Sequence, residues 1–375
     1  MQRIRLKNCT ITSRFGAEIA TEYPTTYVTE LVRTGKIADP DFGNNAKQLY
    51  DTNRAGCDFI TKIEADEKIA SYPNAILILS GILGKAEIFF DGFSVGFSDS
   101  YGEEQRIVLH PYLTVGTHEL RIRFSPQTEK GRVPEDFTNG ALHPPVLDFG
   151  LTGKAEILFF REAAIDTVRT KQVHKDGRVS LSIEVSTLGK CENVKAIASL
   201  TSPAGKIYYS GLPGGRGTAV IPDPEYWLPK TLGTPSLYRL GVALYADDEV
   251  ADEAFVNVGL RSVTSTGFGQ DDTAPYSMQI CGVPFAFVGT DYAGEKILPC
   301  FDAKIAEKTV RDLVGAGISV LRFPASSGYP REELLTLCDR YGLCTVLELP
   351  KLRAEGRGVH LAEIKAKIDL LARHP

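Results

Sequence analysis

His118-Glu119-Leu120-Arg121-Ile122-Arg123-Phe124 is the stretch of this 375-residue sequence that decides its N-terminal fold, because apolar and charged residues alternate along it. A period of two is expected of a β-strand with one buried face. Upstream, Lys85–Phe90 ends at Asp91-Gly92, a tight-turn dipeptide that predicts a hairpin. Short strands with frequent glycine and proline favour an antiparallel sandwich. Residues 1–160 are therefore predicted to form a jelly-roll-like β-sandwich, which the first 60 residues wrap as extended segments and loops.

A second strand-rich region follows. Residues 179–186 alternate valine, leucine and isoleucine with serine and glutamate, and a glycine-rich loop lies at 211–215. Further apolar strands are predicted at Leu237–Tyr245 and Phe255–Val258. Roughly 100 residues in several short strands suit an immunoglobulin-like sandwich, which we assign to residues 161–265. Val263–Tyr276, rich in Ser, Thr, Gly and Asp, is interpreted as a linker.

The pattern changes to strand–helix alternation in residues 266–375. The predicted strands are Phe285–Val288, Ser319–Phe323 and Cys344–Leu349, and the predicted helices are Ala303–Gly315, Arg331–Tyr341 and His360–Arg373. Such alternation requires a parallel sheet with right-handed crossovers. The fold class is thus multidomain β plus α/β. The last part corresponds to the first three β/α units of a (β/α)8 (TIM) barrel, too few to close it.

Charge and cysteine content limit the partners. The net charge is −5 and lysine and arginine are scattered, which argues against nucleic acid or an anionic membrane and is compatible with a neutral sugar. The seven cysteines form no CxxC pair, so reduced thiols in the cytoplasm are expected rather than a metal site or a disulfide framework. The N-terminus has no apolar run typical of a signal peptide. No nucleotide-binding, HExxH or GxSxG motif occurs, and no cofactor is expected.

Several stretches, in order along the chain, resemble glycoside hydrolase family 2 and its β-mannosidase and β-galactosidase branches. Tyr27–Leu31 and Ile37–Asn45 are similar to the N-terminal segment of β-mannosidase-type enzymes, and Ala86–Gly92 with His118–Phe124 is similar to a family hairpin. The end of the middle sandwich and the opening of the barrel are matched by Trp227–Pro229, Leu237-Tyr238, Val258–Val263, Cys281–Phe285, Leu321-Arg322 and Leu337–Leu343.

This resemblance implies a β-glycosidase that binds a β-linked oligosaccharide or glycoside. Carried over by position, the substrate-binding candidates are Asp291, Tyr292, Arg322, Tyr329 and Glu348, at or near the carboxyl ends of barrel strands. Structural alternatives stay open. Arg322 could form a buried ion pair with Glu348 or Asp291, Glu348 could be a structural carboxylate, and both tyrosines could serve packing.

The family's two catalytic carboxylates follow its fourth and seventh barrel strands. Arg373-His374-Pro375 resembles the motif just before the fourth strand, so no catalytic residue is assigned within this chain, which is expected to be inactive alone. The sequence also departs from the family. Its aromatic-rich stretch is replaced by Phe137–Ala141, and Phe323-Pro324 stands where a tryptophan often follows the second-strand arginine.

These departures keep an alternative function open, namely a non-catalytic carbohydrate-binding or scaffold protein with a degenerate family 2 fold. A third interpretation treats the last 100 residues as a small independent α/β domain. The sequence leaves the recognised sugar undetermined, and homo-oligomerisation stays open.

Overall fold

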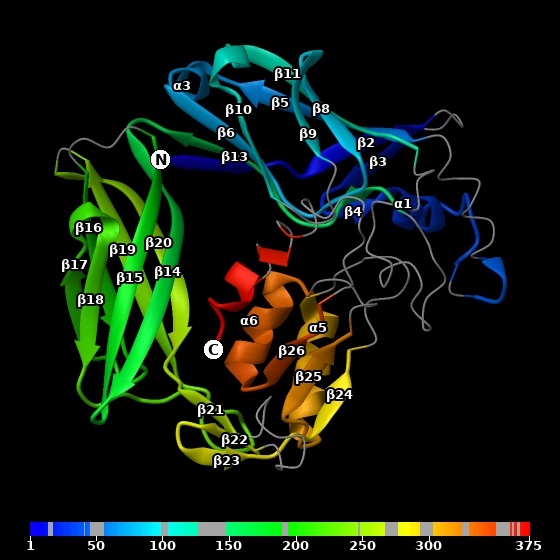
Figure 1. Cartoon of the computed structure of the whole chain (residues 1–375). Coiled ribbons are helices and arrows are strands. Elements are labelled where there is room, and N and C mark those ends of the chain that lie inside the picture. Colours follow the sequence, from blue (N-terminus) through cyan, green and yellow to red (C-terminus); the bar gives the residue numbers. More distant parts are fainter. Residues whose placement is uncertain are drawn as a thin grey trace.

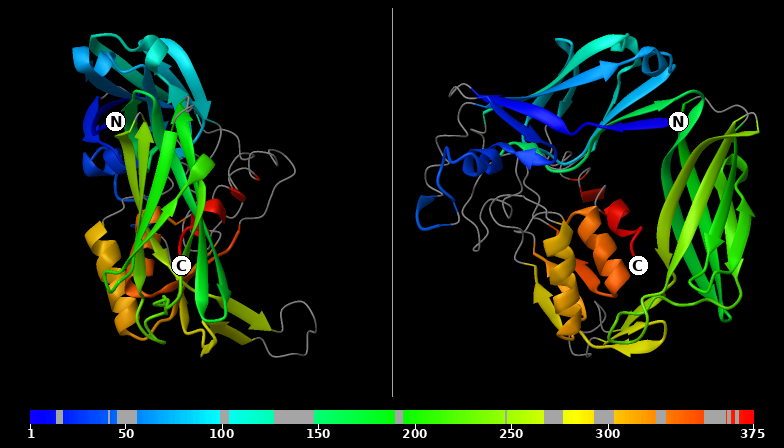
Figure 2. Two further views of the ribbon diagram at one scale, coloured as in Figure 1. Left: turned by 90° about the vertical axis from the view of Figure 1, so that its left-hand side faces the viewer. Right: turned by 180° about the vertical axis from the view of Figure 1, so that it is seen from behind.

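The computed structural model describes residues 1–13, 18–40, 42–45, 56–98, 104–126, 148–189, 194–246, 248–266, 277–292, 303–324, 330–349, 361, 364–365 and 368–375. The chain forms a β-sandwich, a second β-sandwich, a small antiparallel sheet and a parallel β/α unit (Figure 1). The parallel unit lies beneath the first sandwich and beside the second, so that the parts close into a ring (Figure 2).

Two facing sheets and a small third sheet build the first sandwich. The six-stranded sheet has the order β3 (Ile19–Glu22), β2 (Asn8–Ser13), β5 (Cys57–Ala65), β11 (Gly116–Phe124), β8 (Ala86–Phe90), β9 (Phe93–Ser98). The four-stranded sheet has the order β1 (Gln2–Arg5), β13 (Ala155–Phe160), β6 (Asn74–Leu79), β10 (Gln105–Val108). The third sheet is β4 (Thr25–Thr26), β12 (Gly150–Leu151), β7 (Ile82–Leu83).

The predicted alternation produces this core. Leu120, Ile122 and Phe124 of β11 are buried and belong to one apolar cluster with residues of both large sheets. The hairpin between β8 and β9 turns at Asp91 (φ 48°) and Gly92 (φ 82°), and two positive φ values are what a two-residue hairpin turn requires. The sandwich and the hairpin are therefore present as predicted, while the jelly-roll topology stays a prediction.

The N-terminal region contains more regular structure than the sequence suggested. Helix α1 (Tyr27–Arg33) begins at Thr26, whose side chain caps it by accepting from the Thr29 backbone N–H. Two further short helices, α3 (Glu67–Ala70) and η2 (His110–Tyr112), lie between strands of the sandwich. The prediction of extended segments and loops was wrong for α1, because its seven residues are too few to show a helical period.

Seven strands in two sheets form the second sandwich, with η3 (Pro213–Gly215) in the predicted glycine-rich loop. One sheet is β14 (Ala163–Lys175), β15 (Arg178–Gly189), β18 (Arg216–Ile221). The other is β17 (Ile207–Gly211), β16 (Val194–Thr201), β19 (Leu237–Ala246), β20 (Glu249–Gly259). The apolar residues at 179, 181, 183 and 185 all point into the core. This confirms a sandwich, and its immunoglobulin-like topology stays a prediction.

The predicted linker is only partly a linker. β21 (Val263–Thr266) pairs with β22 (Ser277–Ile280), which pairs with β23 (Val283–Phe285) in a small antiparallel sheet. Residues 267–276 lie outside the described part. The run Phe285–Val288 was therefore wrongly assigned as the first parallel strand, because Phe285 still pairs backwards with Met278.

The parallel unit contains three strands and two crossover helices. Its order is β24 (Gly289–Asp291), β25 (Val320–Phe323), β26 (Cys344–Leu347), with α5 (Ala303–Gly315) and α6 (Glu332–Tyr341) between them. Both helices were predicted to within one residue. Further helical residues lie at 361, 364–365 and 368–371. One face of this sheet packs on α5 and α6 through Leu321 and Phe323.

Candidate functional site

Three of the predicted site residues lie together at the carboxyl end of the parallel sheet. Asp291 is the last residue of β24, Arg322 is the third of four residues in β25, and Glu348 directly follows β26. The register pairs Asp291 with Arg322, and the Glu348 N–H donates to the Phe323 carbonyl at 3.0 Å. Parallel pairing therefore brings to one edge side chains that are far apart in the sequence.

The guanidinium of Arg322 bridges the two acids. Its Nη1 donates to Asp291 Oδ1 at 3.0 Å and to Oδ2 at 2.9 Å, while Nη2 donates to Glu348 Oε2 at 2.7 Å. Charge-assisted hydrogen bonds of this kind are stronger than neutral ones and fix orientation. The expected convergence of Asp291, Arg322 and Glu348 is thus confirmed, and we call these three residues the Arg322 cluster.

The Arg322 cluster is half exposed to solvent. The side-chain exposures are 46% for Arg322, 53% for Asp291 and 47% for Glu348. The hydrogen bonds that Arg322 donates to Asp291, and secondly the charge of that carboxylate, raise the pKa of Arg322, so the guanidinium stays positive. The alternative of a buried structural pair was wrong on burial. An exposed ion pair adds little to stability, so these contacts do more to orient the side chains than to hold the fold.

The two predicted tyrosines have different outcomes. The Tyr292 ring lies 5.2 Å from that of Phe323, within the apolar cluster that packs against the helices. Arg322 precedes Phe323 in β25, so its side chain points to the opposite face of the sheet, where it is exposed. Tyr292 therefore fits the packing alternative, and its sugar contact stays a prediction. Tyr329 lies outside the described residues.

Contacts with both sandwiches fix the parallel unit in the ring. The buried Trp227 donates its indole N–H to the Asp339 carbonyl at 2.8 Å, and His374 Nδ1 lies 2.6 Å from Asp339 Oδ2. At the other end of α6, Arg331 donates to the Thr152 carbonyl of the first sandwich. Sequence reasoning used Trp227 and His374 only as family markers, because no local pattern reveals a contact over 112 residues.

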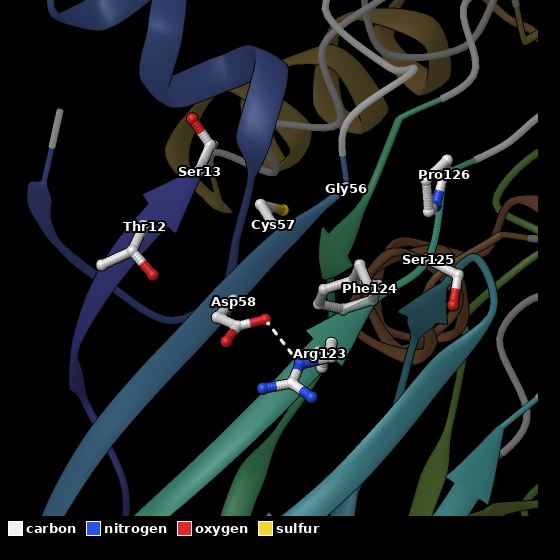
Figure 3. A pocket seen from close by; sticks show the side chains of 9 residues that line it. All are labelled: Thr12, Ser13, Gly56, Cys57, Asp58, Arg123, Phe124, Ser125 and Pro126. Carbon is white, nitrogen blue, oxygen red and sulfur yellow. Dashed lines mark hydrogen bonds and ion pairs between the residues drawn. The ribbon is translucent and has the colours of Figure 1, made fainter. Parts of the chain in front are cut away.

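A cavity of about 550 Å³ on the first sandwich was missed by sequence reasoning (Figure 3). It lies where β2 and β11 end and β5 begins, and it is lined by Thr12, Ser13, Gly56, Cys57, Asp58, Arg123, Phe124, Ser125 and Pro126. Arg123 had been recognised only as an outward-facing residue of an alternating strand. Its neighbours Thr12 and Asp58 come from other strands, so only the sheet register brings them together.

The described part of the chain contains neither a metal-binding group nor a membrane-spanning helix. No group of three or more His, Cys, Asp or Glu side chains there could hold a metal ion. None of its helices has the length and apolarity needed to cross a membrane.

Comparison with known proteins agrees with this architecture. Residues 9–173 match the family described as "Glycosyl hydrolase 2 galactose-binding domain-like", and residues 163–261 match "Glycosyl hydrolases family 2". The β-glucuronidase of Felis catus is 30% identical over 187 residues, which are 48% of this chain and 26% of that protein.

Two solved structures share the fold across the whole chain. The β-D-mannosidase from Dictyoglomus thermophilum has a TM-score of 0.89 at 16% identity and covers 100% of this chain, which covers 51% of it. The exo-chitosanase CsxA of Amycolatopsis orientalis has a TM-score of 0.81 at 16% identity, and the match covers 100% of this chain and 48% of the chitosanase. At such identities the likeness concerns the fold alone.

Two sandwiches matched by glycosyl hydrolase domain families, followed by a parallel β/α unit, place the chain in the class of modular glycosyl hydrolases. Through residues 9–261 the chain belongs to glycoside hydrolase family 2. It spans about a quarter of the length of the cat β-glucuronidase and about half of the two bacterial structures.

Proposed function

We propose that this chain is the N-terminal part of a glycoside hydrolase that cleaves β-linked sugars, of the β-mannosidase or β-galactosidase type. The observation that carries the proposal is the Arg322 cluster, because it lies at the carboxyl end of a parallel sheet that follows two family 2 sandwiches. The carboxyl ends of barrel strands are where barrel enzymes assemble their active sites.

In this proposal β24, β25 and β26 are the first three strands of a (β/α)8 barrel. The described helices α5 and α6 pack on one face of the sheet, and Arg322 and Val346 lie on the other face, which would become the barrel interior. The cluster would bind sugar hydroxyls, since Arg322 holds Asp291 and Glu348 in fixed positions as acceptors.

The acid/base and the nucleophile would come from later strands of the same barrel. Glycoside hydrolysis needs one carboxylic acid to protonate the leaving oxygen and a second carboxylate across the bond. Asp291 and Glu348 both accept hydrogen bonds from one guanidinium, an arrangement that suits binding and orientation better than proton donation. We therefore expect no hydrolysis by the 375-residue chain itself.

The test compares this chain with a longer form of the protein that continues past Pro375. Both are assayed with aryl β-mannoside, β-galactoside and β-glucuronide. The longer form should hydrolyse one of the first two, and Arg322→Ala should lower its kcat/KM at least about tenfold, equivalent to about 1.4 kcal/mol. Turnover by the 375-residue chain that Arg322→Ala abolishes would contradict our placement of the catalytic pair. A strict preference for the β-glucuronide would contradict the sugar type.

A non-catalytic carbohydrate-binding or scaffold protein is the second candidate. The observation that favours it is the single tryptophan, Trp227, which is 1% exposed and engaged with Asp339, so it cannot stack on a sugar. Sugar sites commonly use an aromatic face for such stacking. Absence of turnover by the longer form, together with retained sugar binding, would select this candidate.

The cellular compartment and self-association are further parts of the proposal. The five cysteines that the structure describes are all free, which supports a reducing compartment such as the cytoplasm. Apolar residues exposed on the parallel unit, among them Ile305, Val346 and Ile368, would be covered by the rest of a barrel or by a second copy. Analytical ultracentrifugation of the 375-residue chain and of the longer form gives their masses in solution and distinguishes these two possibilities.

A further inference from the structure

The cavity on the first sandwich is a second place at which a ligand could be held. Its polar side chains form a row across three strands, because Thr12 pairs with Asp58 and Asp58 pairs with Arg123 in the sheet register. In Figure 3 these residues lie side by side at the ends of β2, β5 and β11. The Arg322 cluster belongs to the parallel unit, a different part of the ring (Figure 1).

The guanidinium of Arg123 is fixed in place yet has donors to spare. It stacks on the Phe89 ring with 4.9 Å between its Cζ and the ring centroid, and its Nε lies 3.3 Å from Asp58 Oδ1. Among the interactions of the described residues, its Nη1 and Nη2 donate no hydrogen bond. A planar group immobilised in this way loses little entropy when it binds a ligand.

Acceptor and hydroxyl groups complete the lining. Within the described part of the chain, Asp58 receives two hydrogen bonds, from Arg121 and Arg123, both at 3.3 Å, which is longer than a usual N–H···O bond. Its carboxylate can therefore accept more. The hydroxyls of Thr12 and Ser125 make no hydrogen bond within the described part, and they add groups that can both donate and accept.

The charges of this cavity balance. Arg123 is matched by Asp58, and the neighbouring Arg121 is matched by Glu119 at 2.7 Å. Burial raises the pKa of the Cys57 thiol well above its ordinary value, so the cavity floor carries no charge there. A lining without net charge that offers both donors and acceptors disfavours a free ion. It suits a ligand whose groups both donate and accept hydrogen bonds, as sugar hydroxyls do.

We propose that this cavity is a carbohydrate-binding site for a neutral mono- or disaccharide, independent of the Arg322 cluster. Vicinal hydroxyls would accept from Arg123 Nη1 and Nη2 and donate to Asp58, while Thr12 and Ser125 contact further hydroxyls. Pro126 supplies apolar surface for the C–H face of the sugar. The cavity volume lies within the range of small-molecule sites and has room for such a ligand.

The test is isothermal titration calorimetry of the 375-residue chain with methyl β-D-mannoside, methyl β-D-galactoside, methyl β-D-glucoside and cellobiose. Sodium sulfate and sodium glucuronate form the anion arm. We expect saturable binding of at least one neutral sugar, with a dissociation constant on the order of millimolar, a typical strength for few contacts. Arg123→Gln should weaken this binding at least about tenfold, and Thr12→Val severalfold.

Two control variants locate the binding. Arg121→Gln removes an arginine of the same strand and face that also contacts Asp58 but does not line the cavity, so it should change the affinity less than about threefold. Arg322→Ala disrupts the Arg322 cluster, so any sugar binding that this variant loses belongs to the proposed active site and not to the cavity. Circular dichroism checks that each variant is folded.

Three results would overturn the proposal. These are no saturable binding at tens of millimolar sugar, binding that Arg123→Gln and Thr12→Val leave intact, and binding of the two anions but of no neutral sugar. If, in the second of these results, the binding is lost in Arg322→Ala, the proposed active site is supported instead.

Discussion

The first sandwich and the parallel unit bury their sheets in different ways. The sandwich encloses its core between two sheets, and residues such as Phe59, Phe90 and Leu77 have no exposed surface. Among the described residues, helices α5 and α6 pack against one face of the parallel sheet, so Leu321 is buried, while Arg322 on the opposite face is half exposed. The first sandwich completes its core from its own residues, whereas the parallel unit leaves the carboxyl end of one sheet face exposed.

This difference separates stability from function. In the sandwich, the period-two pattern fills the interior, so a substitution there acts mainly on folding. In the parallel unit, Val320 at the start of β25 packs with Ile280 and Phe285, but the carboxyl end of the same face has little packing to lose. Its polar residues are held there by hydrogen bonds to one another. Residues that contribute little to stability at a strand end are expected to serve binding.

The largest expected effect contrasts the two regions directly. Phe59→Ala removes a ring that lies 5.2 Å from Phe124 in the closed core, and should lower the free energy of unfolding by about 3–5 kcal/mol. Val346→Ala acts at a side chain that is 42% exposed, and should cost less than about 0.5 kcal/mol. Urea unfolding of both variants measures the contrast. A loss of more than about 1.5 kcal/mol for Val346→Ala would show that the open face is covered in solution.

A buried carboxyl group in the closed region should make its stability depend on pH. Burial raises the pKa of Asp148 from 3.8 to about 6, although Oδ1 accepts from the backbone N–H groups of Val28 and Phe149. Because the folded pKa is the higher one, the proton's contribution is fully present below pH 3.8 and is lost as the pH rises through about 6. The shift corresponds to about 3 kcal/mol.

Asp148→Asn keeps the Oδ1 acceptor and removes the charge. It should flatten the pH dependence between about pH 4 and 7 and leave the chain at least as stable as the wild type at pH 8. Asp148→Ala is the matched control, since it also removes the acceptor for two buried N–H groups and should destabilise at every pH. The urea unfolding midpoints of the wild type and both variants at pH 5 and pH 8 measure these differences in stability. An unchanged pH slope in Asp148→Asn would mean that Asp148 does not titrate in this range.

A smaller effect is expected where the second sandwich contacts the parallel unit. Trp227→Phe keeps an aromatic ring but removes the 2.8 Å bond to the Asp339 carbonyl, which should cost about 1–2 kcal/mol. Hydrogen exchange should increase in α6 and β26 and change little in the first sandwich. The control is Tyr209→Phe, at a ring that is 72% exposed. If the amides of α6 are equally protected from hydrogen exchange in both variants, Trp227 does not hold the parallel unit in place.

The sequence predicted local structure well because local structure follows side-chain periodicity. The alternation at 118–124 and 179–186 became β11 and β15, and Ala303–Gly315 became α5 with the same bounds. The Phe285–Val288 run was misassigned because a short apolar run carries no information about its pairing partner. Helix α1 was missed because its start depends on the Thr26 cap rather than on a pattern.

The two candidate sites differ in how far the sequence could reveal them. Asp291, Arg322 and Glu348 were predictable because the carboxyl ends of parallel strands share one edge. The cavity of Asp58 and Arg123 was not, because antiparallel strands 65 residues apart meet in a register that their sequences do not specify. The contact between Trp227 and Asp339 was hidden for the same reason.

The smallest expected effect on stability is that of Arg322→Ala, and it tests the open region most directly. Arg322 has an exposed guanidinium whose bonds to Asp291 and Glu348 form in competition with water, so removing it should leave the melting temperature of the chain unchanged within error. Leu321→Ala, one residue earlier and 1% exposed, should lower it clearly, since that side chain packs between the sheet and the helices. Differential scanning fluorimetry of the two variants supplies the comparison. A large drop for Arg322→Ala would identify the cluster as a structural ion pair that holds the three strands together, and would remove the reason for assigning it to sugar binding.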